Sequence, residues 1–166
     1  MALLERWMQR SERWMYREGR PNRLAAALNR AWAIVGAAGL GPGRLVTLEV
    51  RGRQSGRVIS FPLVAVSLHG ERFLVAMLGE GTSWVANVRA AGGQAVLRQG
   101  RRERVQLVEI APGDRAPILQ RYLQLAPAAR SFVPVDRHAP LSEFEGIAAQ
   151  FPVFRIRSTK ESGRGR

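Results

Sequence analysis

The sequence predicts an α+β protein built on a small closed or split antiparallel β-barrel, with helices at its N-terminus and at its corners. From residue 44 onward the apolar residues recur with a period of two, as strands with one buried face require. The strands come in consecutive runs separated by turn residues, and helical stretches interrupt these runs instead of following every strand. That order favours a barrel over a doubly wound parallel sheet.

The length and composition fit a single domain. A chain of 166 residues that is 46% hydrophobic can build one substantial core, but it is short for two. We expect an N-terminal helical segment at residues 1–43, the split β-barrel at residues 44–158 and a disordered tail at residues 159–166. The tail, STKESGRGR from residue 158, is polar and lacks apolar residues to bury.

Two helices are expected before the barrel. Residues 3–17, LLERWMQRSERWMYR, carry apolar residues on one face and charged residues on the other. This helix either docks on the core of its own domain or lies on a membrane surface, where Trp and Arg are the expected residues. A second helix is predicted at residues 22–37, and GLGPG at residues 39–43 ends it.

The elements of the barrel follow from alternation and from turn residues. The predicted order is strands at residues 45–50, 58–68 and 72–78, a helix capped by Thr82 or Ser83 and stopped by Gly92 and Gly93, strands at 94–99 and 102–110, a helix at 115–125, a helical region, and a last strand at 153–157.

The residue inventory disfavours several kinds of chemistry. The chain has no cysteine, which excludes disulfides, thiolate catalysis and zinc sites built on Cys, and its two histidines, His69 and His138, are too few for a His-rich metal centre. No GxSxG motif is present, and Glu143 and Glu145 fall on opposite sides of a helix or loop. A hydrolase with its own acid and base is therefore disfavoured, and chemistry supplied by a cofactor remains.

The charge points to small anionic partners more than to nucleic acid. The formal net charge is +13, but the basic residues are scattered, and Lys160 is the only lysine among 26 basic residues, a bias typical of GC-rich bacterial genomes. Such a surface favours phosphorylated cofactors, lipid headgroups or acidic tails. No apolar run reaches the ~18 residues of a membrane span. We expect a cytoplasmic protein, with residues 3–17 as its one candidate contact with the inner face of the membrane.

The segment RGRQSGR at residues 51–57 is the first candidate site. Gly52 and Gly56 allow a tight turn, Ser55 offers a hydroxyl, and the arginines offer forked donors that match phosphate or carboxylate oxygens. Taken alone, the segment is either a solvated turn or an anion site.

A second segment, GTSWVANVRAAGG at residues 81–93, begins as a glycine-rich loop and continues into a helix N-terminus, which favours anions. Trp84 and Asn87 lie three residues apart on one face of that helix. Taken singly, Trp84 fits a core residue, and Asn87 fits an amide that tethers a loop.

Together, LVTLEVRGRQSGRVISFPLV, GTSWVANVRAAGG, VLRQGRRERVQLVEI and APILQRYLQLAP resemble the deazaflavin-dependent nitroreductase family, actinobacterial split-barrel oxidoreductases that use coenzyme F420. The resemblance runs in order from about Leu45 to Arg157. Its most specific parts are GRxSG at residues 52–56 and WxxNxxA at residues 84–90.

The resemblance implies an FMN-binding-like split barrel and assigns a role to each part of the site, with F420 as cofactor and FMN or FAD as alternatives. The phosphate and acidic tail would contact the turn, at Arg53, Gln54, Ser55, Gly56 and Arg57. The ring would lie against the following strand, at Phe61, Pro62, Leu63 and Val64, with its polar edge near the backbone groups of Met77, Leu78 and Gly79. The helix would brace the pocket with Trp84 and Asn87, and its Arg89 would lie near the phosphate.

The resemblance implies hydride transfer from the reduced deazaflavin to a small apolar acceptor such as a quinone, an enone or a nitro compound, with no side chain required as acid or base. Two departures stand out. Glu80 in GEGTSW puts an acidic group near the anionic coenzyme, and the substrate region reads ARSFVPVDRHAPLSEFEG. The alternative is a non-catalytic barrel that binds a fatty acid or other hydrophobic anion through Arg51, Arg53 and Arg57. A monomer and a homodimer fit equally well.

Overall fold

The computed structural model describes residues 44–126, 129–130 and 132–159. The predicted helices at residues 3–17 and 22–37, and the predicted tail from residue 160 on, lie outside these residues. The described elements are β1 (Leu45–Arg51), β2 (Val58–Leu68), β3 (Glu71–Val75), α3 (Ser83–Ala90), β4 (Gln94–Gln99), β5 (Arg101–Glu109), η1 (Pro112–Asp114), α4 (Ala116–Leu125), α5 (Leu141–Ile147), η3 (Ala148–Gln150) and β6 (Val153–Ser158).

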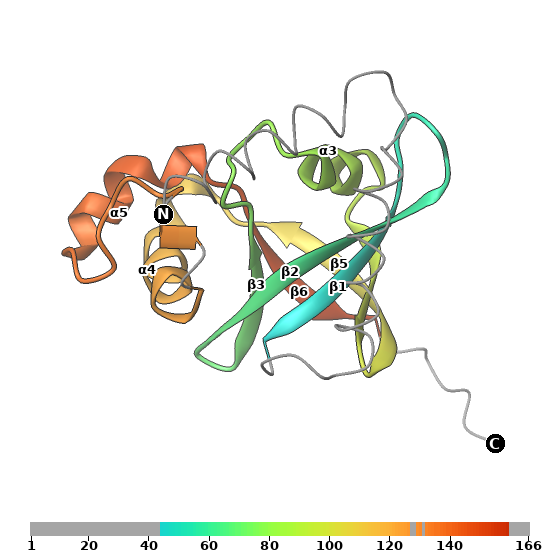
Figure 1. Cartoon of the computed structure of the whole chain (residues 1–166), viewed down its shortest axis with the longest axis horizontal. Coiled ribbons are helices and arrows are strands. Elements are labelled where there is room, and N and C mark those ends of the chain that lie inside the picture. The colour runs from blue at the N-terminus through green and yellow to red at the C-terminus, as the bar shows by residue number, and fades with distance from the viewer. Residues whose placement is uncertain (1–43, 127–128, 131, 160–166) are drawn as a thin grey trace, which may run out of the picture.

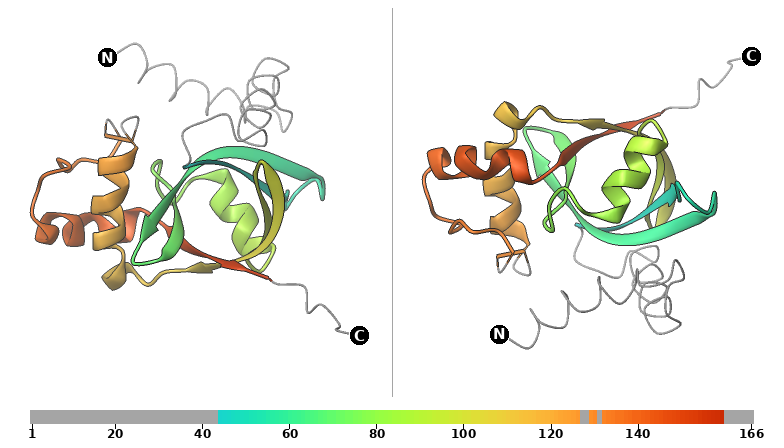
Figure 2. Two further views of the ribbon diagram at one scale, coloured as in Figure 1. Left: turned by 90° about the horizontal axis from the view of Figure 1, so that it is seen from below. Right: turned by 90° about the horizontal axis from the view of Figure 1, so that it is seen from above.

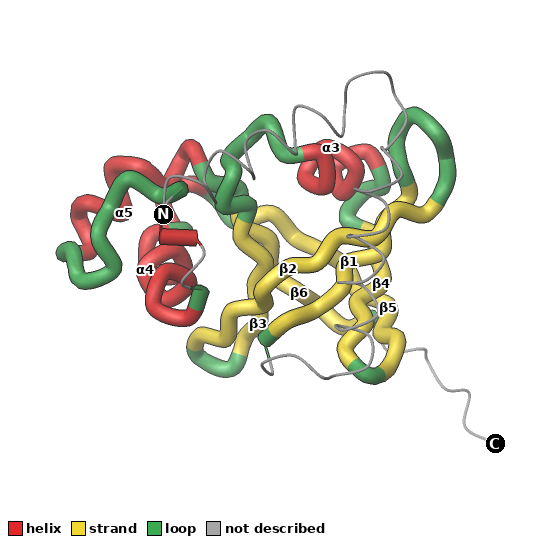
Figure 3. The backbone as a smooth tube through the Cα atoms, viewed as in Figure 1, coloured by secondary structure: helices red, strands yellow, loops and turns green. Residues whose placement is uncertain are grey.

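The strands form a closed barrel in the order β1-β2-β3-β6-β5-β4, and each neighbouring pair is antiparallel. Figures 1 and 3 show the strands wrapping round one another, with the helices outside the wall or at its end. The predicted α+β antiparallel barrel is confirmed. Closure between β1 and β4 is short, since the ladder pairs only Thr47–Glu49 with Val96–Arg98.

Alternation along the strands fills the barrel. On β1, Val46, Leu48 and Val50 are buried in the cluster that occupies the interior. Helix α3 lies across one end of the barrel (Figure 2) and adds Trp84 and Val88 to the same cluster. The centroid of the Trp84 ring lies 5.5 Å from that of the Phe154 ring on β6, and the two ring planes are tilted by 56°. The helix therefore closes this end of the barrel as a plug.

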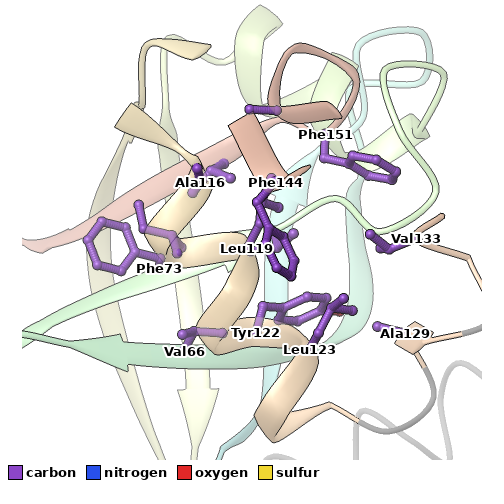
Figure 4. Packing of buried hydrophobic residues seen from close by; sticks show 14 of the residues in the cluster. Val66, Phe73, Ala116, Leu119, Tyr122, Leu123, Ala129, Val133, Phe144 and Phe151 are labelled. Atoms are coloured by element: carbon purple, nitrogen blue, oxygen red, sulfur yellow. The ribbon is translucent and has the colours of Figure 1, made fainter. Parts of the chain in front are cut away.

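A second apolar cluster lies outside the barrel wall. Strand β2 serves both clusters, because Ala65 faces the barrel interior while the next residue, Val66, packs with α4 and α5. Figure 4 shows Phe144 and Tyr122 meeting in this outer layer beside Leu119. The helical region predicted before the last strand thus contains α5, whose apolar residue Phe144 is fully buried.

The strand predicted at residues 72–78 ends earlier than expected. β3 stops at Val75, because the chain turns and the Gly79 N–H donates to the Ala76 carbonyl at 3.0 Å. The apolar residues Met77 and Leu78 therefore belong to the loop before α3, where they are half-buried.

Arg115 ties the outer layer to the barrel. Its side chain is almost inaccessible to solvent, and its guanidinium donates to the carbonyls of Ile110 at 2.8 Å, Ala148 at 3.2 Å and Phe151 at 3.3 Å. Its Nη2 lies 3.4 Å from Glu109. Burial lowers the pKa of this guanidinium and Glu109 opposes that effect, but an arginine remains charged in a folded protein. The carbonyls around it satisfy a charge that would otherwise be costly to bury.

We predict that Arg115→Met lowers the free energy of unfolding by about 3 kcal/mol, because the buried carbonyls of Ile110 and Phe151 lose their donor and that of Ala148 keeps only the Phe151 N–H among the described residues. Urea denaturation followed by circular dichroism measures this change. Arg121→Met is the control: among the described residues Arg121 donates to Gln124 alone, on its own helix, so little change is expected. Equal effects of the two substitutions would contradict the role given to Arg115.

Glu103 on β5 closes a contact between three strands. Its carboxylate accepts hydrogen bonds from the Ser158 hydroxyl on β6 and from the Arg72 guanidinium on β3 at 2.8 and 2.9 Å. Burial opposes ionisation of Glu103, but the bonds from Ser158 and Arg72 outweigh it and hold the pKa of the carboxyl below its usual value. A depressed carboxyl pKa stabilises the folded state above the unfolded pKa and loses this effect as the pH falls through the folded pKa.

We therefore predict that Glu103→Gln is less stable than the unmodified protein by about 1 kcal/mol at pH 7, since the pair is partly solvated. The difference should shrink towards zero as the pH is lowered below the usual range for glutamate. Urea titrations from pH 7 down to pH 3 test this. A difference independent of pH would mean that the charge on Glu103 has no part in the effect.

Candidate functional site

The segment RGRQSGR forms the turn between β1 and β2. The Gly52 N–H donates to the Arg57 carbonyl at 2.7 Å, and the Gly56 N–H donates to the Gly52 carbonyl at 2.9 Å. Gly56 has φ +68°, which L side chains rarely adopt, and a Cβ on Gly52 would lie 2.8 Å from Ile59 Cδ1. The backbone of the turn therefore requires glycine at position 56, whereas a side chain at position 52 would need Ile59 and Ser55 to shift.

The polar side chains of the turn face solvent. Arg53, Gln54, Ser55 and Arg57 are all exposed, and Gly56 with them. Ser55 Oγ accepts the Arg57 N–H at 3.2 Å, which leaves its hydroxyl proton free to donate to a ligand. Within the described part of the chain, no hydrogen bond or ion pair engages the Arg57 guanidinium. The turn therefore presents the donors that an anion would need.

Asn87 connects the turn to α3. Its Oδ1 accepts the Arg53 backbone N–H at 3.2 Å and the Arg53 Nη1 at 2.9 Å, and the side chain is 3% exposed. One amide oxygen thus fixes both the main chain and the guanidinium of Arg53, while the other guanidinium nitrogens remain available. The two segments singled out in the sequence meet at this contact, and Asn87 is the loop-tethering amide that its position suggested.

We predict that Asn87→Leu lowers the free energy of unfolding by about 2 kcal/mol, because two partly buried hydrogen bonds are lost. It should also speed hydrogen exchange of the Arg53 amide. Asn87→Asp keeps an acceptor for both donors and should restore protection. Exchange measured by NMR on both variants distinguishes the tether from a general packing defect, which Asn87→Asp would leave unrepaired.

Arg89 has carboxylate partners on both sides. Its guanidinium binds Glu80 in the loop before α3 at 2.8 Å and Glu109 at the end of β5 at 2.5 Å. The bonds to Glu109 and Glu80 raise the pKa of Arg89, and the bond from Arg89 lowers the pKa of Glu80. The acidic residue expected to face an anionic coenzyme therefore neutralises Arg89 instead. Arg89 is not free to bind a phosphate unless these pairs open.

Within the described residues, the N-terminal half of β2 has no strand partner along one edge. Residues 58–64 pair with β1, whereas β3 pairs with β2 only from Ala65 onward. Since the Ala65 N–H bonds to Arg44, alternate residues such as Ser60 and Pro62 turn their backbone groups towards the open edge. Pro62 has no N–H, so its place on this edge costs no hydrogen bond.

The four residues predicted to face a ring divide between the two faces of β2. Phe61 and Leu63 are half-buried against the interior cluster, while Val64 packs on the outer cluster and Pro62 shares the Val64 side of the strand. One flat ring cannot contact all four side chains, although it can lie against the edge that they share.

Two of the residues predicted in the loop before α3, Met77 and Leu78, have backbone donors that are unpaired within the described part of the chain. Gly79 is occupied, since its N–H bonds to Ala76 and its carbonyl accepts the Thr82 hydroxyl at 2.6 Å. The N–H groups of Met77 and Leu78 make no hydrogen bond within the described residues. Trp84 is 4% exposed and belongs to the barrel core. Of this group, only Met77 and Leu78 can reach a ligand through unpaired backbone donors.

Two residues of this region were not predicted from the sequence: Glu109, which pairs with Arg89, and Arg115, which pairs with Glu109. Glu109 is 20 residues from Arg89 in the sequence, so no local motif joins them.

The described residues contain no helix long and apolar enough to cross a membrane. They also contain no group of three or more His, Asp or Glu placed to hold a metal ion.

No protein-family model and no curated protein matches this chain. Solved structures do resemble it. Protein Atu2129 of unknown function, from Agrobacterium tumefaciens, is 13% identical with TM-score 0.52, and the match covers 82% of this chain and 55% of that one. An F420-H2 dependent reductase is 17% identical with TM-score 0.46, covering 69% and 94%. An FAD-binding protein from Mesorhizobium loti is 16% identical with TM-score 0.46, covering 77% and 90%.

These likenesses concern the fold. The described strands form a closed antiparallel barrel of the split-barrel class.

Proposed function

We propose that this chain is an oxidoreductase that binds coenzyme F420 at the β1–β2 turn and along the open edge of β2. The contact of Asn87 with Arg53 carries the proposal, because it joins the two motifs of the resemblance in one place. The same contact fixes the turn to α3, so Arg53 would already be in place when an anion arrives.

The donor set of the turn fits the anionic end of such a coenzyme. Arg53 is held at one nitrogen and offers the others, Arg57 offers an unengaged guanidinium, and Ser55 offers its hydroxyl proton. Arg89 is left out of the phosphate contacts, because Glu80 and Glu109 hold it. The proposed anion site therefore consists of the turn, with the helix in a supporting role.

The apolar edge of β2 would hold the ring, and the N–H groups of Met77 and Leu78 would bind its polar edge. When bound in reduced form, a deazaflavin supplies a hydride. The chain's own contribution is orientation and the exclusion of water, which can supply several kcal/mol of the barrier reduction. No side chain is required as an acid or a base, and the acceptor would be a small apolar molecule such as a quinone, an enone or a nitro compound.

The test is a parallel fluorescence titration of the protein with F420, FMN and FAD. We expect F420 to bind most tightly, and Arg53→Ala to weaken it by about tenfold, as the loss of a charge-assisted hydrogen bond implies. Ser55→Ala and Asn87→Leu should weaken F420 binding less than Arg53→Ala does. Ser55 acts mainly on the shape of the turn, and Asn87 acts on the ligand only through Arg53.

Arg121→Ala on α4 is the matched control and should bind as the unmodified protein does. Binding of F420 that is unaffected by Arg53→Ala would refute the assigned site while leaving the cofactor class open. No binding of F420, FMN or FAD, together with no oxidation of reduced F420 by a quinone panel, would refute the proposed function.

A further inference from the structure

A groove opens in the barrel wall where β1 and β4 separate. The ladder between these strands ends at Glu49 and Val96, although β1 continues to Arg51 and β4 begins at Gln94. The groove that results has a volume of about 430 Å³, within the ~300–1,000 Å³ typical of small-molecule sites. None of the residues predicted to face the deazaflavin ring lines it.

The lining of the groove is positively charged and partly apolar. It comprises Glu49, Val50, Arg51, Val58, Gln94, Ala95, Val96, Arg102, Arg104, Val105, Gln106 and Thr159. Three arginines therefore face one carboxylate. Valine and alanine side chains supply the apolar surface between the charged ends.

The one carboxylate of the groove is already neutralised. Glu49 is 8% exposed, and its two oxygens accept from Arg98 at 3.0 Å and from Arg102 at 2.9 Å. Arg98 does not line the groove, so half of the compensation comes from outside it. Arg102 is 67% exposed at the side chain and retains further donors. Arg51 adds a further positive charge, since its one hydrogen-bond partner in the described residues is the neutral Gly56 carbonyl at 3.2 Å. The field within the groove is thus positive, and a cationic ligand would be repelled.

We infer that this groove binds a small amphipathic anion, with a carboxylate or phosphate monoester at one end and an apolar body at the other. The headgroup would be held by the arginines of the rim, and the body would cover Val58 and Val96. Val58 is 64% exposed, the most exposed of the large apolar side chains in the described part of the chain. A ligand here would remove that surface from water.

This inference does not rest on the proposed function, because none of the turn residues 53–57 lines the groove, although Arg51 of the groove donates to the Gly56 carbonyl of the turn at 3.2 Å. The two sites can therefore be tested separately, on the full chain and with different probes.

The probes are decanoate and decyl phosphate, each below its micelle concentration, with decanol as the uncharged control. Binding is followed by amide chemical shifts in NMR. We expect both anions to shift the amides of Val96 and Gln106, and decanol to bind at least about tenfold more weakly, because it cannot form charge-assisted hydrogen bonds. Response to only one of the two anions would support the inference and identify the headgroup.

Two variants make the test specific. Arg102→Gln removes a rim cation while Arg98 still holds Glu49, and Val58→Glu adds a carboxylate at the rim. Each should weaken decanoate binding by about tenfold or more. The matched controls are Arg121→Gln on α4 and Leu141→Glu on α5, which should bind as the unmodified protein does.

Equal binding of decanol and decanoate, shifts confined to amides away from the groove, or affinity unchanged in both rim variants would each overturn the inference. F420 titrated into the same variants gives the independent readout. Loss of decanoate binding with F420 binding intact separates the groove from the turn.

Discussion

The guanidinium of Arg115 is buried from solvent, and it contacts the ends of several helices and strands. Ile110 follows β5, Ala148 begins η3, Phe151 precedes β6, and α4 begins at the next residue. Through Glu109, which also binds Arg89, the same guanidinium is linked to α3 and to the loop before it. Arg115 thus holds together the end of β5, the start of α4 and η3, while the apolar cluster with Val66, Tyr122 and Phe144 packs the outer helices on the barrel.

The candidate site depends on that arrangement, because α3 carries Asn87. Once the helix is fixed across the barrel end by Trp84 and by the Arg89 pairs, Asn87 stands where the β1–β2 turn can reach it. A single amide oxygen thus holds Arg53 of the turn in place. Binding groups held before the ligand arrives lose less entropy on binding, which is the advantage of such a tether.

Much of the barrel could be predicted from local pattern. The strands at 58–68 and 94–99 have the predicted bounds, since alternation and flanking glycines are local signals. The strand predicted to end at Leu78 ends at Val75, because a turn bonded within the chain replaced strand pairing. The ion pair of Glu80 with Arg89 could not be predicted from local pattern, because folding brings the two side chains together.

The sequence by itself determined the alternating strands, the tight turn with its two glycines and the helix that carries Trp84 and Asn87. These features depend on neighbouring residues and on backbone sterics, which are properties of short segments. The tertiary structure alone decided that Arg89 is neutralised, that Arg115 anchors the corner, and that β1 and β4 separate to leave a groove lined by arginines. Charge pairing and strand closure join residues far apart in the chain, so their outcome depends on the complete barrel.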